Sequence, residues 1–169
     1  YGDYQCPYCG EAYPVIRQVF SDLQSQIYFQ FRNFPLVNDH PNAFAAARAA
    51  EAAGLQGKFW QMHDLLYDQN GAYYNGGQPP NSWLGAKDPT PYFDADAAQL
   101  GLDANKFKSD YASIKVNDLI NADEAAGTKA KVQATPTFIL DGKQVSLPYQ
   151  KGVKAVEKVI NDVISSKSR

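Results

Sequence analysis

Cys6 and Cys9 are the only cysteines in the 169-residue chain, and two residues separate them in the stretch DYQCPYCGEAYP. Cysteines at this spacing serve three kinds of chemistry: reversible disulfide exchange, metal binding or a structural disulfide. A disulfide between them would close a ring of only four residues, which restricts the unfolded chain little and makes a purely structural role a poor explanation. A redox-active dithiol is the interpretation that C-x-x-C close to a strand and a helix favours.

A zinc site is another interpretation, and it needs about four ligands. His40 and His63 are the only histidines that can complete such a set with the cysteines. Their separation is far larger than the roughly three to five residues between the paired histidines of a zinc finger. We therefore expect no metal, although a zinc-binding structural domain stays an alternative that metal analysis of the purified protein would test.

The spacing of the cysteines predicts their roles if the motif begins a helix. Cys6 would then lie at the N-cap or in the first turn, where unpaired main-chain N–H groups and the helix dipole favour a thiolate and lower its pKa. Pro7 suits the first helical position, since its missing N–H costs nothing there. Cys9 would lie deeper and act as the resolving thiol, while Tyr8 helps to set the balance between the two redox states.

In disulfide exchange, a substrate thiolate attacks the sulfur of Cys6 in the oxidised pair, and a second substrate thiolate resolves the mixed disulfide. The reverse sequence of steps reduces a substrate disulfide. The stabilisation of the Cys6 thiolate decides the direction, because each unit by which its pKa falls favours the reduced form by about 1.4 kcal/mol. The residues alone leave the direction open.

Helical patterns surround this motif. Apolar residues recur at helical spacing directly after it, and Pro14 lies within that helix. Residues 26–35, QIYFQFRNFP, are rich in aromatic residues and predict a strand. An Asp-Gly pair at 141–142 separates two β-rich runs within 135–147 and predicts a type I′ hairpin. The other predicted helices are 42–54, 58–69, 94–100, 105–111, 116–131 and 153–164.

Residues 71–91 predict a loop of roughly twenty residues, which is long for a compact domain. The aromatic residues Tyr73, Tyr74 and Trp83 in this segment have two interpretations. They either pin a surface excursion to the body of the protein or form an aromatic lip that contacts substrates. We favour the first interpretation.

Three segments, GDYQCPYC, HPNAFAAARAAEAAGLQGKFWQMHDLLY and ATPTFILDG, follow one another along nearly the whole chain. With them the chain resembles the DsbA-like thiol–disulfide oxidoreductases of the thioredoxin superfamily, whereas glutaredoxins share C-P-Y-C but resemble a bare domain. The resemblance implies an α/β, thioredoxin-like fold with residues 1–35 and 132–169 as its core and residues 36–131 as an all-helical insertion. It also implies activity outside the cytosol, in the periplasm, the cell envelope or the medium, on cysteine-containing protein substrates.

The resemblance assigns a second element of the site, Pro136 in ATPT, as a cis-proline that faces the cysteines. Proline lacks an N–H and adopts the cis form at little cost. The preceding Thr135 would then offer its main chain to a substrate peptide as a short edge strand. From the residues alone, a trans proline at the first position of a strand is an equally good interpretation.

Three further polar residues have an ordinary interpretation beside a functional one. Asp3 precedes Cys6 where the family often carries an acid, and a buried acid with a raised pKa would pass a proton to Cys9. We prefer a turn or cap role for Asp3. His63 is interpreted as a packed residue of a helix, and His40 as a cap or loop residue.

In a thioredoxin-like fold a central strand leads into the C-x-x-C motif, and here it would lie before Tyr1. Main-chain groups left unpaired beside an absent strand cost roughly 1–3 kcal/mol each. We therefore expect an N-terminal central strand that is truncated in this chain, together with a missing signal or anchor, or else a strand from a partner. This topology predicts that residues 28–32 and 137–140 do not pair directly and that a slot separates them.

Composition limits the remaining functions. The net charge is −2 without a basic run, which argues against nucleic acid as a partner, and no apolar run reaches the roughly 18 residues of a membrane span. We predict a protein-disulfide oxidoreductase, more an oxidase than a reductase, that needs no cofactor beyond its own disulfide and is regenerated by a membrane redox partner. A reductase or isomerase on the same fold, and a peptide-binding or chaperone module with idle thiols, are the alternatives.

Overall fold

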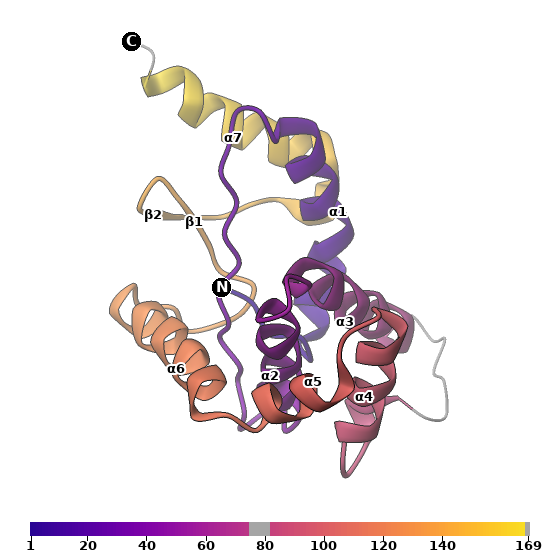
Figure 1. Ribbon diagram of the computed structural model, residues 1–169. Coiled ribbons are helices and arrows are strands. Elements are labelled where there is room, and N and C mark those ends of the chain that lie inside the picture. The colour runs from indigo at the N-terminus through magenta and orange to yellow at the C-terminus, as the bar shows by residue number, and fades with distance from the viewer. Residues whose placement is uncertain (75–81, 168–169) are drawn as a thin grey trace.

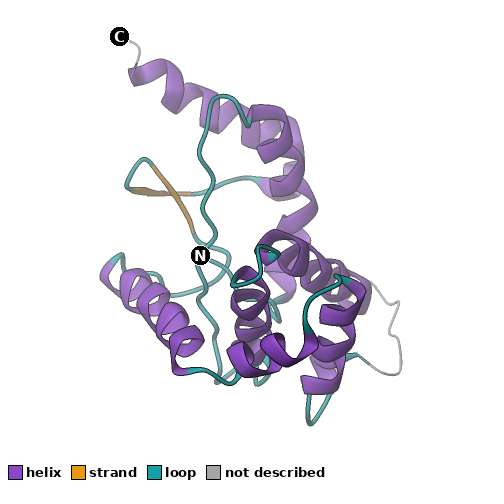
Figure 2. Cartoon of the chain, viewed as in Figure 1, coloured by secondary structure: helices purple, strands orange, loops and turns teal. Residues whose placement is uncertain are grey.

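The computed structural model describes residues 1–74 and 82–167, and most of these residues lie in helices (Figures 1 and 2). Two short strands, β1 (Phe138–Leu140) and β2 (Lys143–Val145), form the sheet of the described chain, and two 3₁₀ turns lie at Trp83–Gly85 and Tyr149–Lys151. The helices are α1 (Pro7–Leu23), α2 (Ala43–Gly54), α3 (Phe59–Tyr74), α4 (Thr90–Gln99), α5 (Ala104–Tyr111), α6 (Ile114–Lys129) and α7 (Val153–Lys167).

Helix α1 carries the cysteine motif and packs along α7 (Figure 1). It begins where the sequence predicts, with Cys6 as N-cap and a proline at its first position, and it continues through Pro14. The C-terminal half of α1 contributes Val19 and Leu23 to a buried apolar cluster with residues of α7. The C-terminal helix therefore braces the helix that bears both thiols.

Helices α2–α6 form the helical block that lies between the first and last parts of the chain (Figure 2). Helix α2 is rich in alanine, which has the highest helix propensity and the smallest side chain that packs. Its small residues let α3, α5 and α6 pack against it from several directions. Helix α3 packs in turn against α1, so the block contacts the motif-bearing helix directly. The boundaries at residues 36 and 131 stay predictions.

The hairpin forms as its sequence predicts. β1 and β2 pair in antiparallel register, with Phe138 opposite Val145 and Leu140 opposite Lys143. Asp141 and Gly142 have φ values of 54° and 76°, the left-handed conformation that a type I′ turn requires at both central residues. The turn places β1 at the end of the segment that begins with Thr135.

The strand predicted over residues 26–35 is wrong for the described structure. Only Asn33 forms a β-bridge, and its partner is Gly2. The Gly2 N–H donates to the carbonyl of Arg32 at 3.0 Å, and the N–H of Phe34 donates to the carbonyl of Gly2 at 2.8 Å. A strand needs a run of main-chain bonds to a neighbour, and one neighbouring residue supports one bridge rather than a ladder.

Tyr1 bonds through its main chain to Thr137, in the segment that leads into β1. Its amino group donates to the carbonyl of Thr137 at 2.8 Å, and the Thr137 N–H donates to the carbonyl of Tyr1 at 3.0 Å. The first two residues thus lie between the segment around Asn33 and the segment that leads into β1. The prediction that residues 28–32 and 137–140 do not pair directly is confirmed, because the sheet of the described residues contains β1 and β2 alone.

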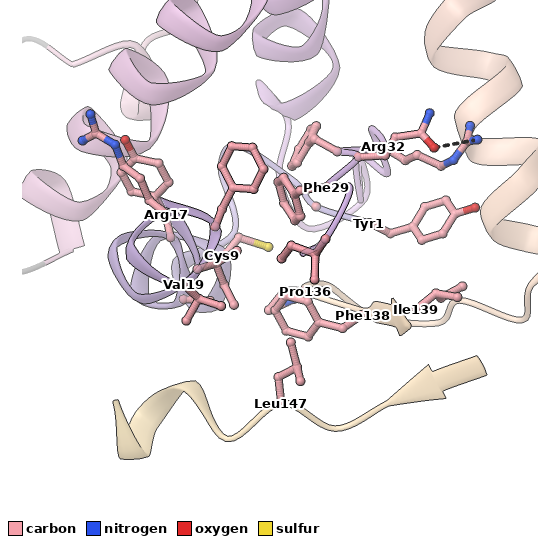
Figure 3. A pocket seen from close by; sticks show the side chains of 18 of the residues that line it. Tyr1, Cys9, Arg17, Val19, Phe29, Arg32, Pro136, Phe138, Ile139 and Leu147 are labelled. Atoms are coloured by element: carbon pink, nitrogen blue, oxygen red, sulfur yellow. Dashed lines mark hydrogen bonds between the residues drawn. The ribbon is translucent and has the colours of Figure 1, made fainter. Parts of the chain in front are cut away.

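An apolar groove of about 630 Å³ separates these two segments (Figure 3). Residues 27–32 line one side of it and residues 136–140 line the other, while Val19 of α1 and Ile160 of α7 contribute apolar surface. Aromatic side chains that line the groove remain partly exposed, including Tyr28 at 90% and Trp60 at 42%. Cys9 also lines it, so the groove reaches the cysteine motif.

The long loop predicted over residues 71–91 is wrong at both ends. Helix α3 continues to Tyr74, and α4 begins at Thr90. A 3₁₀ turn at Trp83–Gly85 precedes α4, and Ser82 caps this turn by accepting from the N–H of Leu84. Trp83 is only 1% exposed, which confirms that it pins its segment to the body. The side chains of Tyr73 and Tyr74 lie outside the described residues.

Candidate active site

Both cysteines lie at the start of α1 as free, buried thiols. Cys6 is the N-cap with extended backbone, and the N–H of Gly10 donates to its carbonyl at 3.1 Å as the first bond of the helix. Cys9 is in the first turn, and each cysteine is 3% exposed. Pro7 occupies the first helical position, and Tyr8 stands outside the core at 61% exposed. The helix start therefore presents one sulfur at its N-cap and another one turn inside.

Thr135 and Pro136 lie opposite the cysteines, as the resemblance implies. The thiol of Cys6 donates to the carbonyl oxygen of Thr135 across 3.4 Å. The peptide bond between Thr135 and Pro136 is cis. Figure 3 shows the sulfur of Cys9 pointing towards the ring of Pro136, from the other side of the groove. The structure thus brings together four of the predicted site residues from the two ends of the chain.

The two thiols have opposite ionisation tendencies. Hydrogen bonding from the thiol of Cys9 is the main reason why the pKa of Cys6 falls to about 6. Burial opposes this effect, while the Thr135 hydroxyl and the main-chain N–H groups of Cys9 and Tyr8 support it. Burial is also the main reason why the pKa of Cys9 rises well above its ordinary value, and the neighbouring Cys6 raises it further. Cys6 is therefore the thiolate at neutral pH and Cys9 the thiol.

Asp3 lies beneath the motif as a carboxylate with four hydrogen-bond donors. Oδ1 accepts from the main-chain N–H groups of Gln5 at 2.7 Å and Cys6 at 3.1 Å. Oδ2 accepts from the N–H of Leu36 at 2.8 Å and contacts Nδ1 of His40 at 2.7 Å. The geometry is that of a residue that organises a turn and a helix start, the role that we preferred for Asp3 from the sequence.

Asn70 contacts the motif directly, and His40 contacts it through Asp3. His40 lies in the loop before α2, as predicted, and Nδ1 of its ring contacts Oδ2 of Asp3. Asn70 of α3 received no role, although its side-chain amide donates to the main-chain carbonyls of Tyr4 and Cys6. No local signal marks Asn70 in the sequence, since its hydrogen bonds reach main-chain carbonyls 66 and 64 residues away.

His63 packs among aromatic rings and takes no part in the contact between the cysteines and Thr135. The rings of Tyr4, Phe31, Trp60 and Tyr67 lie around it with centroid distances of 4.7–5.7 Å. Burial lowers the pKa of His63, so that it is neutral at pH 7. This confirms the interpretation of His63 as a packed residue. Within residues 1–74 and 82–167 the structure contains no group of three or more side chains that can hold a metal ion.

Comparison with known proteins identifies related sequences. The family model described as thioredoxin matches residues 1–162. The Na⁺/H⁺ antiporter NhaA 1 of Salinispora arenicola is 38% identical over 144 residues, which are 85% of this chain and 20% of that protein. The Na⁺/H⁺ antiporter NhaA 3 of Salinispora tropica is 34% identical over 166 residues, which are 98% of this chain and 23% of that protein. The chain therefore spans about a fifth of the length of these relatives.

Two solved structures are similar over nearly the entire chain. A thioredoxin-like oxidoreductase from Silicibacter pomeroyi has a TM-score of 0.70 at 23% identity, covering 98% of this chain and 82% of that one. The oxidoreductase DsbA from Xylella fastidiosa has a TM-score of 0.75 at 17% identity, covering 99% and 83%. In the described part of this chain, no helix has the length and apolarity to cross a membrane. The chain belongs to the thioredoxin family, with the fold of its DsbA-like thiol–disulfide oxidoreductases.

Proposed function

We propose that this chain is an extracytoplasmic protein-disulfide oxidase, which passes the Cys6–Cys9 disulfide to cysteine thiols of folding proteins. The observation that carries the proposal is the asymmetry of the two sulfurs. The pKa of Cys6 is held at about 6, while burial raises the pKa of Cys9 well above its ordinary value. A stabilised Cys6 thiolate favours the reduced pair, and a pair that favours its reduced form is an oxidant.

The asymmetry gives each sulfur one task in the exchange. A substrate thiolate attacks Sγ of Cys6 in the oxidised protein, the Cys6–Cys9 bond breaks, and Cys9 leaves and takes up a proton, which its raised pKa favours. A second substrate thiolate then attacks the substrate sulfur of the mixed disulfide and expels Cys6. Cys6 is a good leaving group because its pKa is low. The substrate loses two electrons, and the cysteine pair gains them.

The reaction needs no group beyond the two sulfurs, and each turnover leaves the pair reduced. We propose that a membrane redox partner reoxidises it, as the resemblance to DsbA-like proteins implies. The same resemblance, together with the DsbA of Xylella fastidiosa among the similar folds, supports action in the periplasm or cell envelope. Protein substrates fit the surroundings of the thiols, because the ring of Tyr8, within the motif itself, is exposed.

The alternatives differ in direction or in the use of the thiols. A reductase on this fold would keep the pair reduced and would have a potential near that of thioredoxin, about −270 mV, whereas an oxidase resembles DsbA at about −120 mV. A peptide-binding module with idle thiols would bind unfolded protein without exchange. The low pKa of Cys6 disfavours an idle role, because it makes the thiolate abundant at neutral pH.

Two measurements test the proposal. Equilibration of the pair with glutathione should give a potential above the roughly −270 mV of thioredoxin, displaced towards the roughly −120 mV of DsbA. The oxidised protein should oxidise reduced ribonuclease A stoichiometrically. Cys6→Ser and Cys9→Ser should each abolish this oxidation, because neither variant can form the disulfide. With oxidised glutathione, the Cys6 thiolate of Cys9→Ser should displace one glutathione thiol and accumulate as a mixed disulfide with the other. A potential near that of thioredoxin would assign the reductase, and unchanged ribonuclease binding with no thiol exchange in any variant would assign the binding module.

A further inference from the structure

Both polar groups of the Cys6 main chain are held by buried side chains from other parts of the fold. The N–H of Cys6 donates to Oδ1 of Asp3 at 3.1 Å. The carbonyl of Cys6 accepts from Nδ2 of Asn70 at 3.1 Å. A residue at an N-cap ordinarily uses its own side chain to organise the helix start. The N-cap Cys6 makes no such side-chain cap bond, so these two side chains orient its peptide groups together with the N–H of Gly10 and the carbonyl of Asp3.

The hydrogen bond from the Cys6 N–H to Asp3 depends on His40. The carboxylate of Asp3 is fully buried, and His40 Nδ1 lies 2.7 Å from Oδ2, with the histidine side chain 15% exposed. The N–H of Leu36 holds the same oxygen. With Oδ2 fixed by these donors, Oδ1 is directed at the N–H groups of Gln5 and Cys6. His40 thus orients a carboxylate that in turn orients the residue before the helix.

The hydrogen bond to the Cys6 carbonyl comes from Asn70 of α3. Asn70 is completely buried, and its Nδ2 bridges the carbonyls of Tyr4 and Cys6 at 2.7 and 3.1 Å. Its Oδ1 has no hydrogen-bond partner in the described part of the chain and lies against Gly10, where an added Cβ would overlap it. The amide is therefore wedged between α3 and the first turn of α1, in one orientation.

We propose that His40, before α2, and Asn70 of α3 are positioning residues that set the redox balance of the Cys6–Cys9 pair. This inference rests on the proposed disulfide exchange. The thiolate of Cys6 is stabilised mainly by the thiol of Cys9, and further by the N–H groups of Cys9 and Tyr8 in the first turn. Those groups converge on one sulfur only if the Cys6 peptide groups on either side of it keep their orientation. His40 and Asn70 supply that orientation from outside the motif.

The variants separate positioning from packing. Asn70→Asp keeps the shape of the side chain but replaces the amide donor by an acceptor facing two carbonyls, and Asn70→Ala removes both shape and donor. Gln69→Ala is the matched control, because Gln69 is the adjacent residue on α3 and donates to Asp96 of α4, away from the motif. His40→Ala removes the contact with Asp3, and His40→Asn restores a donor of similar reach.

The readouts are the equilibrium constant with glutathione and the thiolate absorbance of Cys6 as a function of pH. Loss of one such hydrogen bond should shift the equilibrium constant about three- to tenfold towards the oxidised pair and raise the titration midpoint in Asn70→Asp and His40→Ala. His40→Asn should recover most of the shift, and Gln69→Ala should leave both readouts at the wild-type value.

The outcomes for this inference and for the proposed function are distinguishable. Wild-type protein without thiol exchange would overturn the function, while the thiolate titration still reports on positioning. If the wild type exchanges thiols and both Asn70→Asp and His40→Ala keep its equilibrium constant and midpoint, the positioning role is wrong. A shift in Asn70→Ala with wild-type values in Asn70→Asp would assign Asn70 to packing alone. If the Asn70 variants do not fold, the pair His40→Ala and His40→Asn decides the question.

Discussion

The sulfur of Cys6 lies 3.4 Å from the carbonyl oxygen of Thr135, on the opposite side of the groove mouth and 129 residues away in the chain. The hydroxyl of Thr135 is buried and has no hydrogen-bond partner in the described part of the chain, which leaves it able to donate to a thiolate. It also contributes to the lowered pKa of Cys6. One residue therefore offers an acceptor to the thiol and a donor to the thiolate, and it responds to the ionisation of the sulfur.

Replacement of Thr135 by valine should raise the pKa of Cys6 above its present value of about 6. Valine keeps the branched shape and the carbonyl but removes the hydroxyl. A hydrogen bond to a charged group contributes about 1.5–3 kcal/mol, which corresponds to roughly one to two pH units. The thiolate absorbance at about 240 nm, followed through a pH titration, measures the midpoint.

Thr137→Val is the control for that substitution. The hydroxyl of Thr137 donates to the carbonyl of Ala134 at 2.7 Å and not to either sulfur. The Thr137→Val variant should keep the titration midpoint of the Cys6 thiol unchanged and should be slightly less stable. Equal midpoint shifts in the two valine variants would mean that the segment moves as a whole and that the Thr135 hydroxyl has no specific effect.

The stability of the reduced protein should rise with pH between about 6 and 8.5. The folded pKa of Cys6 is about 6, and an unfolded cysteine titrates near 8.5. Between these values the unfolded chain binds more protons, so the free energy of unfolding increases by at most about 1.4 kcal/mol per pH unit. This contribution is lost as pH falls through about 6. Above about 8.5 the trend reverses, because folded Cys9 keeps its proton longer than unfolded Cys9.

The oxidised protein provides the reference for this measurement, since its disulfide has no thiol to titrate. Urea unfolding of both forms at several pH values gives the difference in their free energies of unfolding. That difference should show the rise described above, while effects of other groups cancel. A difference that stays constant between pH 5 and 8.5 would mean that the folded protein does not stabilise the Cys6 thiolate.

Elements specified by local chemistry could be predicted from the sequence. The alanine-rich stretch gave α2 within a residue, the Asp141-Gly142 turn produced the hairpin, and Pro7 marked the start of α1 with Cys6 as its N-cap. Cys6 and Cys9 followed from their spacing, whereas Thr135 and Pro136 came from the resemblance, because nothing local to Thr135 indicates that Cys6 lies opposite.

Features that depend on distant partners could not be predicted. Residues 26–35 have strand composition, but a strand forms only with a neighbour, and Gly2 provides a single bridge. Asn70 and His40 look ordinary in sequence, since Asn70 contacts the carbonyl of Cys6 across 64 residues and His40 contacts Asp3 across 37 residues. The length of α3 beyond residue 69 was hidden by Gly71, which usually weakens a helix.

Gly10→Ala should destabilise the protein, whereas Gly71→Ala should not. A Cβ at Gly10 would overlap the buried amide of Asn70, and overpacking of this kind costs about 1–3 kcal/mol. A Cβ at Gly71 in α3 meets nothing within 4 Å, and alanine there gains up to about 1 kcal/mol of helix propensity. Urea unfolding of both variants measures the two changes. Similar stabilities would show that Asn70 yields easily to a methyl group.

The groove between residues 27–32 and 136–140 should accept one added strand. Tyr1 and Gly2 already bond to Thr137 on one side and to Arg32 and Phe34 on the other, so a strand joined to Tyr1 would continue both ladders. Helices α1 and α7 contribute apolar residues to the same groove, which suits a strand that is apolar on both faces. Fusion of five Val and Ile residues before Tyr1 should raise the free energy of unfolding by several kcal/mol, at about 1 kcal/mol for each new hydrogen bond plus apolar burial.

A fusion of equal length with proline at its second and fourth positions lacks the ladder donors and should give little of this gain. Hydrogen exchange at Phe29, Phe31 and Ile139 should slow in the first fusion alone. Equal stability and equal exchange in both fusions would mean that the groove does not hold a strand.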